Sequence, residues 1–220
     1  MSPKEAKSTR DRIVEAAVSL FYEHGFAATG MADILKKAKA NSGSFYFFFK
    51  SKHDLLVAVL GWYEHMLQPI LIAPVCEKEH DPIERVFALL GLYRRNILAT
   101  DFAFGCPIGR LALEIDPLDR AHRHIARNFD GWAGAVRVFL DAAGDRLPRE
   151  VNRAQLARFV LSVMEGGVMQ SRSQRSIEPF DDSVAQLREY FRRLEAEAAT
   201  GGSRRGNSKP RKKIKEKSHA

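Results

Sequence analysis

The stretch ADILKKAKANSGSFYFFF, residues 32–49, decides how this chain folds. Its first seven residues carry apolar side chains at helical spacing, and a three-residue break from Lys39 to Asn41 follows. Asn41 is a good N-cap for a second helix through about Phe49. Strand propensity alone favours β structure for the aromatic run, but a helix places Phe45 and Phe49 on one face, four residues apart. The stretch therefore predicts two short helices joined by a tight turn.

A third helix, from about Ser8 to His24, precedes this pair, with Gly25 as its stop. Three short helices with such a break describe a helix-turn-helix and its supporting helix. A helix about 10–12 Å across fits the major groove of DNA. We expect three phenylalanines to pack inward and five small or aromatic residues to face outward. The inward set is Phe45, Phe48 and Phe49, and the outward set is Ser42, Gly43, Ser44, Tyr46 and Phe47.

The rest of the chain also has helical periodicity, and no other segment has a strand pattern. We expect an all-α fold of about nine helices: a three-helix DNA-binding domain at 1–52, a larger helical domain at 53–200, and a basic disordered tail at 201–220. The expected later helices are 51–72, broken by Pro69 and Pro74, and then 82–100, 105–115, 116–143, 149–172 and 179–198.

Composition excludes several classes of protein. With 220 residues, 45% of them hydrophobic and 28% charged, the chain has enough apolar material for a core. Two cysteines fit a reducing cytoplasm, the apolar stretch Leu55–Tyr63 is too short to cross a bilayer, and no secretory signal precedes it. No zinc, phosphate-loop or dinucleotide motif is present. We therefore expect a cytoplasmic protein that is not an enzyme, with no cofactor, no metal and no membrane partner.

The positive charge is concentrated at the two ends. Residues 1–52 carry a net charge of +4 and residues 201–220 a net charge of +7, whereas residues 53–200 carry −3. This polarity suggests that one end meets a polyanion. The tail has two interpretations, a solubilising segment or an arm that binds phosphates without reading sequence.

Residues 9–60 resemble the DNA-binding domain of the tetracycline-repressor (TetR) family. The resemblance is carried by Gly25, Phe26 and Thr29, by ADILKKA (32–38), by GSFY (43–46) with Phe49, and by KSKHDLL (50–56). It implies a homodimer that binds a pseudopalindromic operator in double-stranded DNA and represses transcription until a small-molecule effector binds. It also implies that the helical domain at 53–200 serves effector binding and dimerisation. Two further pieces, 105–115 and 165–180, are similar to stretches in one branch of the family. A non-sequence-specific nucleic-acid-binding protein remains an alternative.

The resemblance also implies roles in DNA binding. Backbone N–H groups of Thr29 and Gly30 would meet phosphate, Ser42 and Ser44 would approach base edges, and Tyr46 would bond a phosphate. Lys39 stands where a turn glycine is common, Ser42 where a lysine is frequent and Phe47 where a histidine is frequent, so Phe47 would instead touch a thymine methyl group. The expected set is Thr29, Gly30, Asn41, Ser42, Gly43, Ser44, Tyr46, Phe47, Lys50 and Lys52.

The later helices supply candidates for an effector pocket and a dimer interface. Aromatic and soft side chains with single polar groups are typical of small-molecule sites: Trp62, Tyr63, Met66, Tyr93, Phe102, Cys106, Arg110, Trp132 and Met169. Amphipathic faces near the C-terminus give the interface candidates: Leu156, Phe159, Val163, Gly167, Val184, Leu187, Phe191 and Leu194. Ordinary core packing is the alternative for both sets. Arg110 requires an anionic ligand or Glu114 as partner, and Cys106 leaves a redox-sensing regulator as another alternative.

Overall fold

The computed structural model describes residues 7–205, and of 201–205 only the backbone. All its regular elements are helical: α1 (Thr9–His24), α2 (Met31–Ala38), α3 (Ser42–Phe48), α4 (Lys52–Met66), the π-helical η1 (Leu67–Ile72), α5 (Ala73–Lys78), α6 (Pro82–Ala99), α7 (Pro107–Glu114), α8 (His122–Ala142), the 3₁₀ turn η2 (Gly144–Arg146), α9 (Arg153–Gln174) and α10 (Glu178–Arg205). Because α4, η1 and α5 continue as one helix, the described chain has nine helices, which confirms the all-α prediction.

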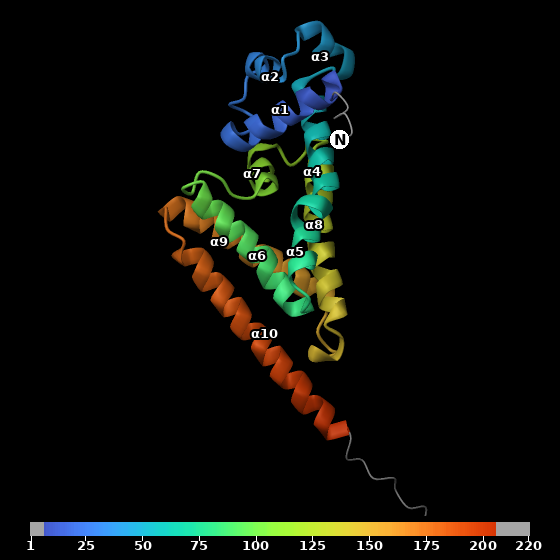
Figure 1. Ribbon diagram of the computed structural model, residues 1–220, viewed down its shortest axis with the longest axis vertical. Helices are drawn as coiled ribbons and strands as arrows, with labels where there is room; N and C mark the ends of the chain where they lie inside the picture. Colours follow the sequence, from blue (N-terminus) through green and yellow to red (C-terminus); the bar gives the residue numbers. More distant parts are fainter. Residues whose placement is uncertain (1–6, 206–220) are drawn as a thin grey trace, which may run out of the picture.

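Helices α1, α2 and α3 form a head at one end of an elongated molecule (Figure 1). Side-chain caps begin its helices as the sequence predicts: Ser8 accepts from the Asp11 N–H, and Asn41 accepts from the Ser44 N–H. The buried core of the head contains Phe45 and Phe49 and extends into α4, α7 and the start of α8. Apolar packing therefore continues beyond residue 52, where we place the end of the DNA-binding domain.

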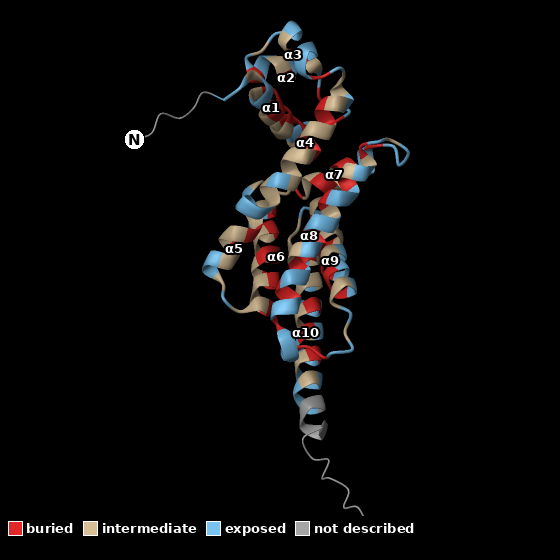
Figure 2. Ribbon diagram, turned by 90° about the vertical axis from the view of Figure 1, so that its right-hand side faces the viewer, coloured by how far each residue is buried: buried red, intermediate tan, exposed pale blue. Residues whose placement is uncertain are grey.

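A second core lies in the body, where α6, α8, α9 and α10 pack together (Figure 2). Within this body α9 and α10 approach each other closely at Gly167, since a Cβ there would lie 3.2 Å from the Cα of Phe180. The glycine therefore serves a helix contact inside one subunit. Phe180 and Phe191 of α10 are almost completely buried, so α10 belongs to this core over that part of its length.

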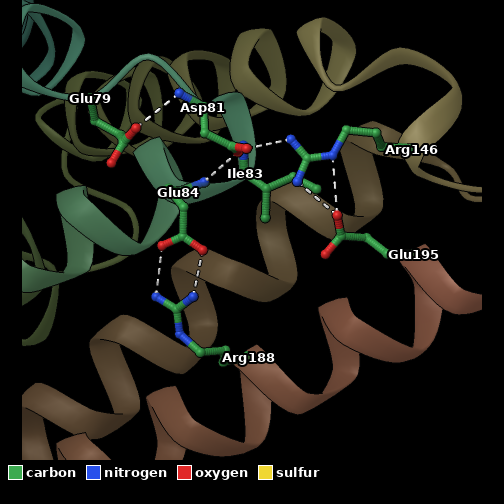
Figure 3. A network of polar contacts seen from close by, with 7 residues as sticks. All are labelled: Glu79, Asp81, Ile83, Glu84, Arg146, Arg188 and Glu195. Atoms are coloured by element: carbon green, nitrogen blue, oxygen red, sulfur yellow. Dashed lines mark hydrogen bonds and ion pairs between the residues drawn. The ribbon is translucent and has the colours of Figure 1, made fainter.

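Ion pairs fix α10 against α6 and η2 (Figure 3). Arg188 of α10 makes a bidentate pair with Glu84 at 2.6 and 3.0 Å and lies 3.8 Å from the centre of the Phe87 ring. Arg146 bridges Asp81 at 2.5 Å and Glu195 at 2.7 Å. Bidentate and networked pairs of this kind hold geometry better than isolated surface pairs do.

The helix Lys52–Lys78 differs from the sequence expectation. It continues through Pro69 and Pro74 instead of ending at Ile72, because the π-helical turn at Leu67–Ile72 accommodates the missing proline N–H. By length and composition alone this 27-residue helix could cross a membrane, although the apolar stretch Leu55–Tyr63 within it is too short to do so. In this fold its apolar side chains are divided between the head core and a cavity in the body.

Three other helix boundaries differ from the sequence expectation. Helix α8 begins at His122 rather than at Pro117, because Asp116 and Asp119 accept from the N–H groups two residues on and hold turns. Helix α9 begins after Asn152, whose side chain accepts from the Ala154 and Gln155 N–H groups. Helix α10 continues to Arg205, past the expected end at Ala198, and residues 206–220 of the expected tail lie outside the described residues.

Candidate functional site

The turn between α2 and α3 is tight and strained. Lys39 has the left-handed conformation, with φ of 50° and ψ of 48°, and the Ala40 N–H returns to the Leu35 carbonyl at 3.0 Å. This 6→1 bond ends α2 in the manner that a glycine usually allows. The lysine at the common glycine position therefore takes the glycine conformation and costs roughly 1 kcal/mol.

Helix α3 presents its outer face to solvent at the end of the head (Figures 1 and 2). Phe47 is 82% exposed and Tyr46 is 64% exposed, while Ser42 and Gly43 are also exposed and Ser44 is half-buried. Phe45 and Phe49 are buried as expected, but Phe48 is 38% exposed, so its assignment to the core was wrong. Phe48 instead packs edge-on against the Phe47 ring, with centroids 4.9 Å apart. The outer face of α3 therefore consists of aromatic rings and small side chains.

Two of the expected phosphate-binding residues have internal partners. Thr29 is 2% exposed, and its backbone N–H, the group expected at phosphate, donates to the Phe26 carbonyl at 3.4 Å. Its hydroxyl donates to the carbonyls of Gly25 at 2.6 Å and Leu20 at 3.2 Å. Lys52 donates to the Phe26 carbonyl and lies 4.4 Å from the centre of the Phe26 ring. Partial burial lowers the pKa of the Lys52 ammonium group. Their side chains hold the loop between α1 and α2 and so position the head.

The other expected DNA-binding residues remain on the surface. Gly30 is the exposed N-cap of α2, and Asn41 is exposed while its side chain caps α3. Lys50 is exposed directly after α3, and Lys36 and Lys39 are exposed on and after α2. The helix-turn-helix therefore carries positive charge beside its outer aromatic face. DNA phosphates attract such lysine side chains.

A cavity of about 720 Å³ lies in the body, between α1, α4, η1, α6, α7, α8 and α9. It brings together six of the residues expected at an effector site: Trp62, Tyr63, Met66, Tyr93, Cys106 and Trp132. The Trp132 indole donates to the Tyr93 hydroxyl at 3.1 Å. Burial raises the pKa of the Tyr93 and Tyr63 hydroxyls, so both phenols stay neutral.

The remaining three candidates lie outside the cavity. Met169 is 60% exposed on the outside of α9, and Phe102 packs beside the body core in a left-handed conformation. Arg110 makes an ion pair with Glu114 at 2.9 Å, which is the alternative partner that the sequence offered. These three expectations for the pocket were therefore wrong.

Arg110 and Glu114 join α7 to the loop between α1 and α2. Glu114 accepts from the Phe26 N–H at 2.7 Å and the Ala27 N–H at 3.2 Å, and Arg110 donates to the Tyr22 carbonyl at 3.1 Å. A Cβ at Gly25 would collide with the Glu114 carboxylate, so the positive φ glycine makes room for this contact. We call Arg110 and Glu114 the α7 clamp. Cys106, Pro107 and Ile108, at the start of the same helix, line the cavity. Helix α7 therefore contacts both the body cavity and the loop between α1 and α2 in the head.

Sequence reasoning missed the main polar groups of the cavity. Tyr22, Asn96 and Glu165 all line it, and the Asn96 amide donates to the Tyr22 hydroxyl at 2.7 Å. Glu165 carries a signal that could have been found, because it stands four residues after Leu161 and three before Val168, on an apolar face of α9. A charged residue on an inward face is a functional candidate.

The thiol of Cys106 is not an activated nucleophile. Burial raises its pKa well above the ordinary value, and the negative charge of Glu165 raises it further. Reactive thiols require the opposite shift. The structure therefore gives no support to redox sensing through a Cys106 thiolate.

A groove of about 850 Å³ follows the outside of α9 and α10. Phe159 is 48% exposed there, and its ring meets that of Tyr190, itself 42% exposed, at 6.0 Å between centroids. Val163 is half-buried in the groove and Val184 half-buried beside it. The other five expected interface residues are buried in the core of their own subunit, which is the alternative that the pattern left open: Leu156, Gly167, Leu187, Phe191 and Leu194. Three of them, Leu156, Gly167 and Leu187, also line the groove.

An all-helical chain with a basic helix-turn-helix head on a hollow helical body is a DNA-binding regulator by architecture. Residues 13–59 match the family described as "Bacterial regulatory proteins, tetR family", and residues 82–186 match the "Transcriptional regulator LmrA/YxaF-like, C-terminal domain". The second match includes both pieces that resembled one branch of the family. The chain therefore belongs to the TetR family of transcriptional regulators.

Relatives agree with this assignment along most of the chain. An uncharacterised HTH-type transcriptional regulator of Mycobacterium tuberculosis (strain H37Rv) is 30% identical, with 81% of this chain and 92% of that protein covered. The HTH-type transcriptional regulator LmrA of Bacillus subtilis is 29% identical, with 78% and 90% covered. The reduced form of NemR from E. coli has the same fold, with a TM-score of 0.73 at 22% identity and 83% and 96% covered. The protein is thus a DNA-binding transcription factor and not an enzyme.

Proposed function

We propose that this regulator is a cytoplasmic homodimer that represses transcription from a pseudopalindromic operator and releases it when a small molecule enters the body cavity. The observation that carries the proposal is the α7 clamp, because it gives the cavity wall a direct contact with the head. One relative, DhaR of Mycobacterium sp. (strain GP1), is named a transcriptional repressor and is 26% identical over 78% of this chain.

The exposed face of α3 is the surface that we propose to enter the major groove. Ser42 and Ser44 would approach base edges, and Phe47 would contact a thymine methyl group. Tyr46 would donate to a phosphate, while Lys50 and the N-terminus of α2 at Gly30 would hold the neighbouring backbone. In this proposal the side chains of Thr29 and Lys52 act indirectly, by fixing the loop that carries α2.

The dimer is proposed to form through the groove along α9 and α10. The exposed pair of Phe159 and Tyr190 supplies apolar area at its centre, and small or amide side chains border it, among them Ser162, Gly166 and Gln186. A twofold axis at this groove would pair α9 and α10 with their copies in a four-helix arrangement. Two heads about 34–36 Å apart would then meet successive major grooves.

Effector binding is proposed to act through α7. A ligand between Trp132, Tyr93 and Cys106 would press on the segment that begins α7, and the clamp would transmit a shift of α7 to the loop after α1. The head would thus have one position with effector bound and another without it, and the operator would bind only the position without effector. Effector and operator would therefore weaken each other's binding by the same factor.

Footprinting on the DNA upstream of the regulator's own gene tests the DNA-binding part of the proposal. We expect one protected site of two inverted half-sites, occupied by two subunits, at nanomolar protein and near-physiological salt. Protection spread evenly over the fragment would favour non-sequence-specific binding. A screen for small molecules that abolish the footprint then tests effector relief.

A further inference from the structure

The body cavity contains a carboxyl group that no protein group satisfies fully. Among the residues that the structure describes, Glu165 Oε1 is a buried side-chain oxygen without a hydrogen-bond partner. The other polar contact of this carboxyl group is the Cys106 thiol, which donates weakly. A buried acceptor left in this way costs stability, so its retention in a cavity suggests a ligand that completes it.

The cavity makes room for this carboxyl group. Glu165 reaches from α9 toward the first turn of α7, where a Cβ at Gly109 would collide with its carboxylate. Glycine at this position therefore lets the acid lie against the cavity wall formed by Cys106 and Pro107. The carboxyl group belongs to the lining of the cavity and not to a salt bridge at the surface.

The charge around the cavity is negative. Within the described part of the chain, no basic side chain lies within 4 Å of the Glu165 carboxylate. The one arginine in the lining, Arg127, is paired with Glu64 at 3.4 Å at the rim. Asp130, exposed on α8, is a third acid of the lining beside Glu165 and Glu64. The lining therefore carries three acids and one arginine, and that arginine is paired with Glu64 and not with Glu165.

The remaining walls are aromatic. Rings of Tyr22, Trp62, Tyr63, Tyr93, Phe129 and Trp132 line the cavity. Aromatic faces attract positive charge, and the attraction is strongest where water is excluded. An unpaired acid among aromatic rings is the usual chemistry of a site for organic cations.

Building on the proposed effector-relieved function, we propose that the cavity selects lipophilic organic cations, with Glu165 as the group that receives the positive charge. The aromatic rings enclose the apolar body of such a ligand, and a volume of about 720 Å³ is ample for a molecule of drug size. Glu165 is thereby the specificity-determining residue of the cavity.

Two ions of the same shape and opposite charge test this proposal. Tetraphenylphosphonium and tetraphenylborate are titrated calorimetrically into the full chain at matched salt and without DNA. We expect the phosphonium ion to bind at least tenfold more tightly than the borate. In Glu165→Gln the affinity for phosphonium should fall about tenfold while that for borate stays or rises. Asp141→Asn, which removes an exposed acid of α8, should change neither.

Equal affinity of the wild-type protein for the two ions would overturn the proposal, and so would a Glu165→Gln variant that is folded but keeps the full phosphonium affinity. If that variant fails to fold by circular dichroism, the wild-type comparison of the two ions decides alone. Operator release is measured separately. Phosphonium that binds through Glu165 but leaves the operator occupied contradicts effector relief, while selection for cations by the cavity stands.

Discussion

At the scale of single residues, Tyr46 offers the sharpest test of the DNA-binding face. It is 64% exposed on α3, so its hydroxyl contributes little to the fold. Tyr46→Phe should therefore leave the thermal unfolding midpoint unchanged and lower operator affinity by about a hundredfold or more, because the proposed dimer would lose two hydrogen bonds to charged phosphates, each worth about 1.5–3 kcal/mol. Fluorescence anisotropy with labelled operator at matched salt measures the change. Unchanged affinity would remove Tyr46 from the contact.

The ionisation of Glu165, the proposed ligand-binding group, should also make the stability of the fold depend on pH. Burial raises the pKa of its carboxyl group in the fold, so ionisation of Glu165 costs more in the fold than in the unfolded chain. The resulting stability is fully present below the unfolded pKa near 4.5 and is lost as pH rises through the higher folded pKa.

Glu165→Gln, which cannot ionise, should consequently be more stable than the wild type at pH 7.5, by about 1 kcal/mol. The gap should close near pH 4. Urea unfolding at both values measures it, with Asp141→Asn as the exposed control. A gap of equal size at both pH values would show that the charge of Glu165 is not its cause.

Single residues also show where sequence reasoning stops. The burial of Phe45 and Phe49 followed from helical spacing, which a short helix obeys whatever it packs on. The exposure of Phe48 did not, because Phe48 stands three residues after Phe45, which helical spacing places on the same face. Helix α3 ends at Phe48 and the backbone is extended at Phe49, which local spacing does not report. The position of Glu165 on an apolar helix face was visible in the sequence. Its place in a cavity was not, because seven elements build that cavity and no local pattern reports their meeting.

At the scale of elements, helix boundaries were predictable where a side chain caps them and uncertain where prolines stand. Ser8 and Asn41 begin their helices as expected. Pro69 was expected to break a helix, yet neighbouring elements support the rod and a π-helical turn absorbs the proline. Pro117 was expected to begin one, yet turns held by Asp116 and Asp119 delay α8 to His122.

The turn between α2 and α3 carries the next prediction. Lys39→Gly should stabilise the protein by up to about 1 kcal/mol, because glycine adopts the left-handed conformation without strain, although it gains more freedom when unfolded. The matched control is Lys36→Gly in the middle of α2, which should destabilise by about 1 kcal/mol. Chemical denaturation compares the two, and a loss of stability in Lys39→Gly would mean that the lysine side chain supports the turn.

Helix α7 carries the prediction for regulation. Glu114→Ala removes the contacts to the Phe26 and Ala27 N–H groups without touching the cavity or α3. We expect effector and operator each to bind the variant alone nearly as well as they bind the wild type, while the mutual weakening falls about tenfold. Glu150→Ala, at an exposed position far along the chain, is the control. Full effector release from Glu114→Ala would show that the signal bypasses the clamp.

At the scale of the whole molecule, the proposed recognition of two half-sites requires two heads, so the amphipathic faces of α9 and α10 would serve both the subunit core and the proposed dimer interface. Periodicity predicted apolar faces correctly but could not divide them between the subunit core and a partner, because both uses produce the same spacing. Leu187 and Phe191 are buried, whereas Phe159 and Tyr190 remain at the surface. This difference in exposure supports the proposed interface at Phe159 and Tyr190.

Phe159→Asp should therefore separate the subunits, because it places a charge at the centre of the proposed interface while the 48% exposed position tolerates a polar side chain in the monomer. Light scattering should give the mass of one chain at micromolar concentration, and operator affinity should fall at least a hundredfold, since each head then binds one half-site alone. Leu118→Asp, at a position 95% exposed between α7 and α8, is the control for an added charge and should keep both properties. A Phe159→Asp protein that remains dimeric and binds the operator normally would mean that the heads are paired through another surface.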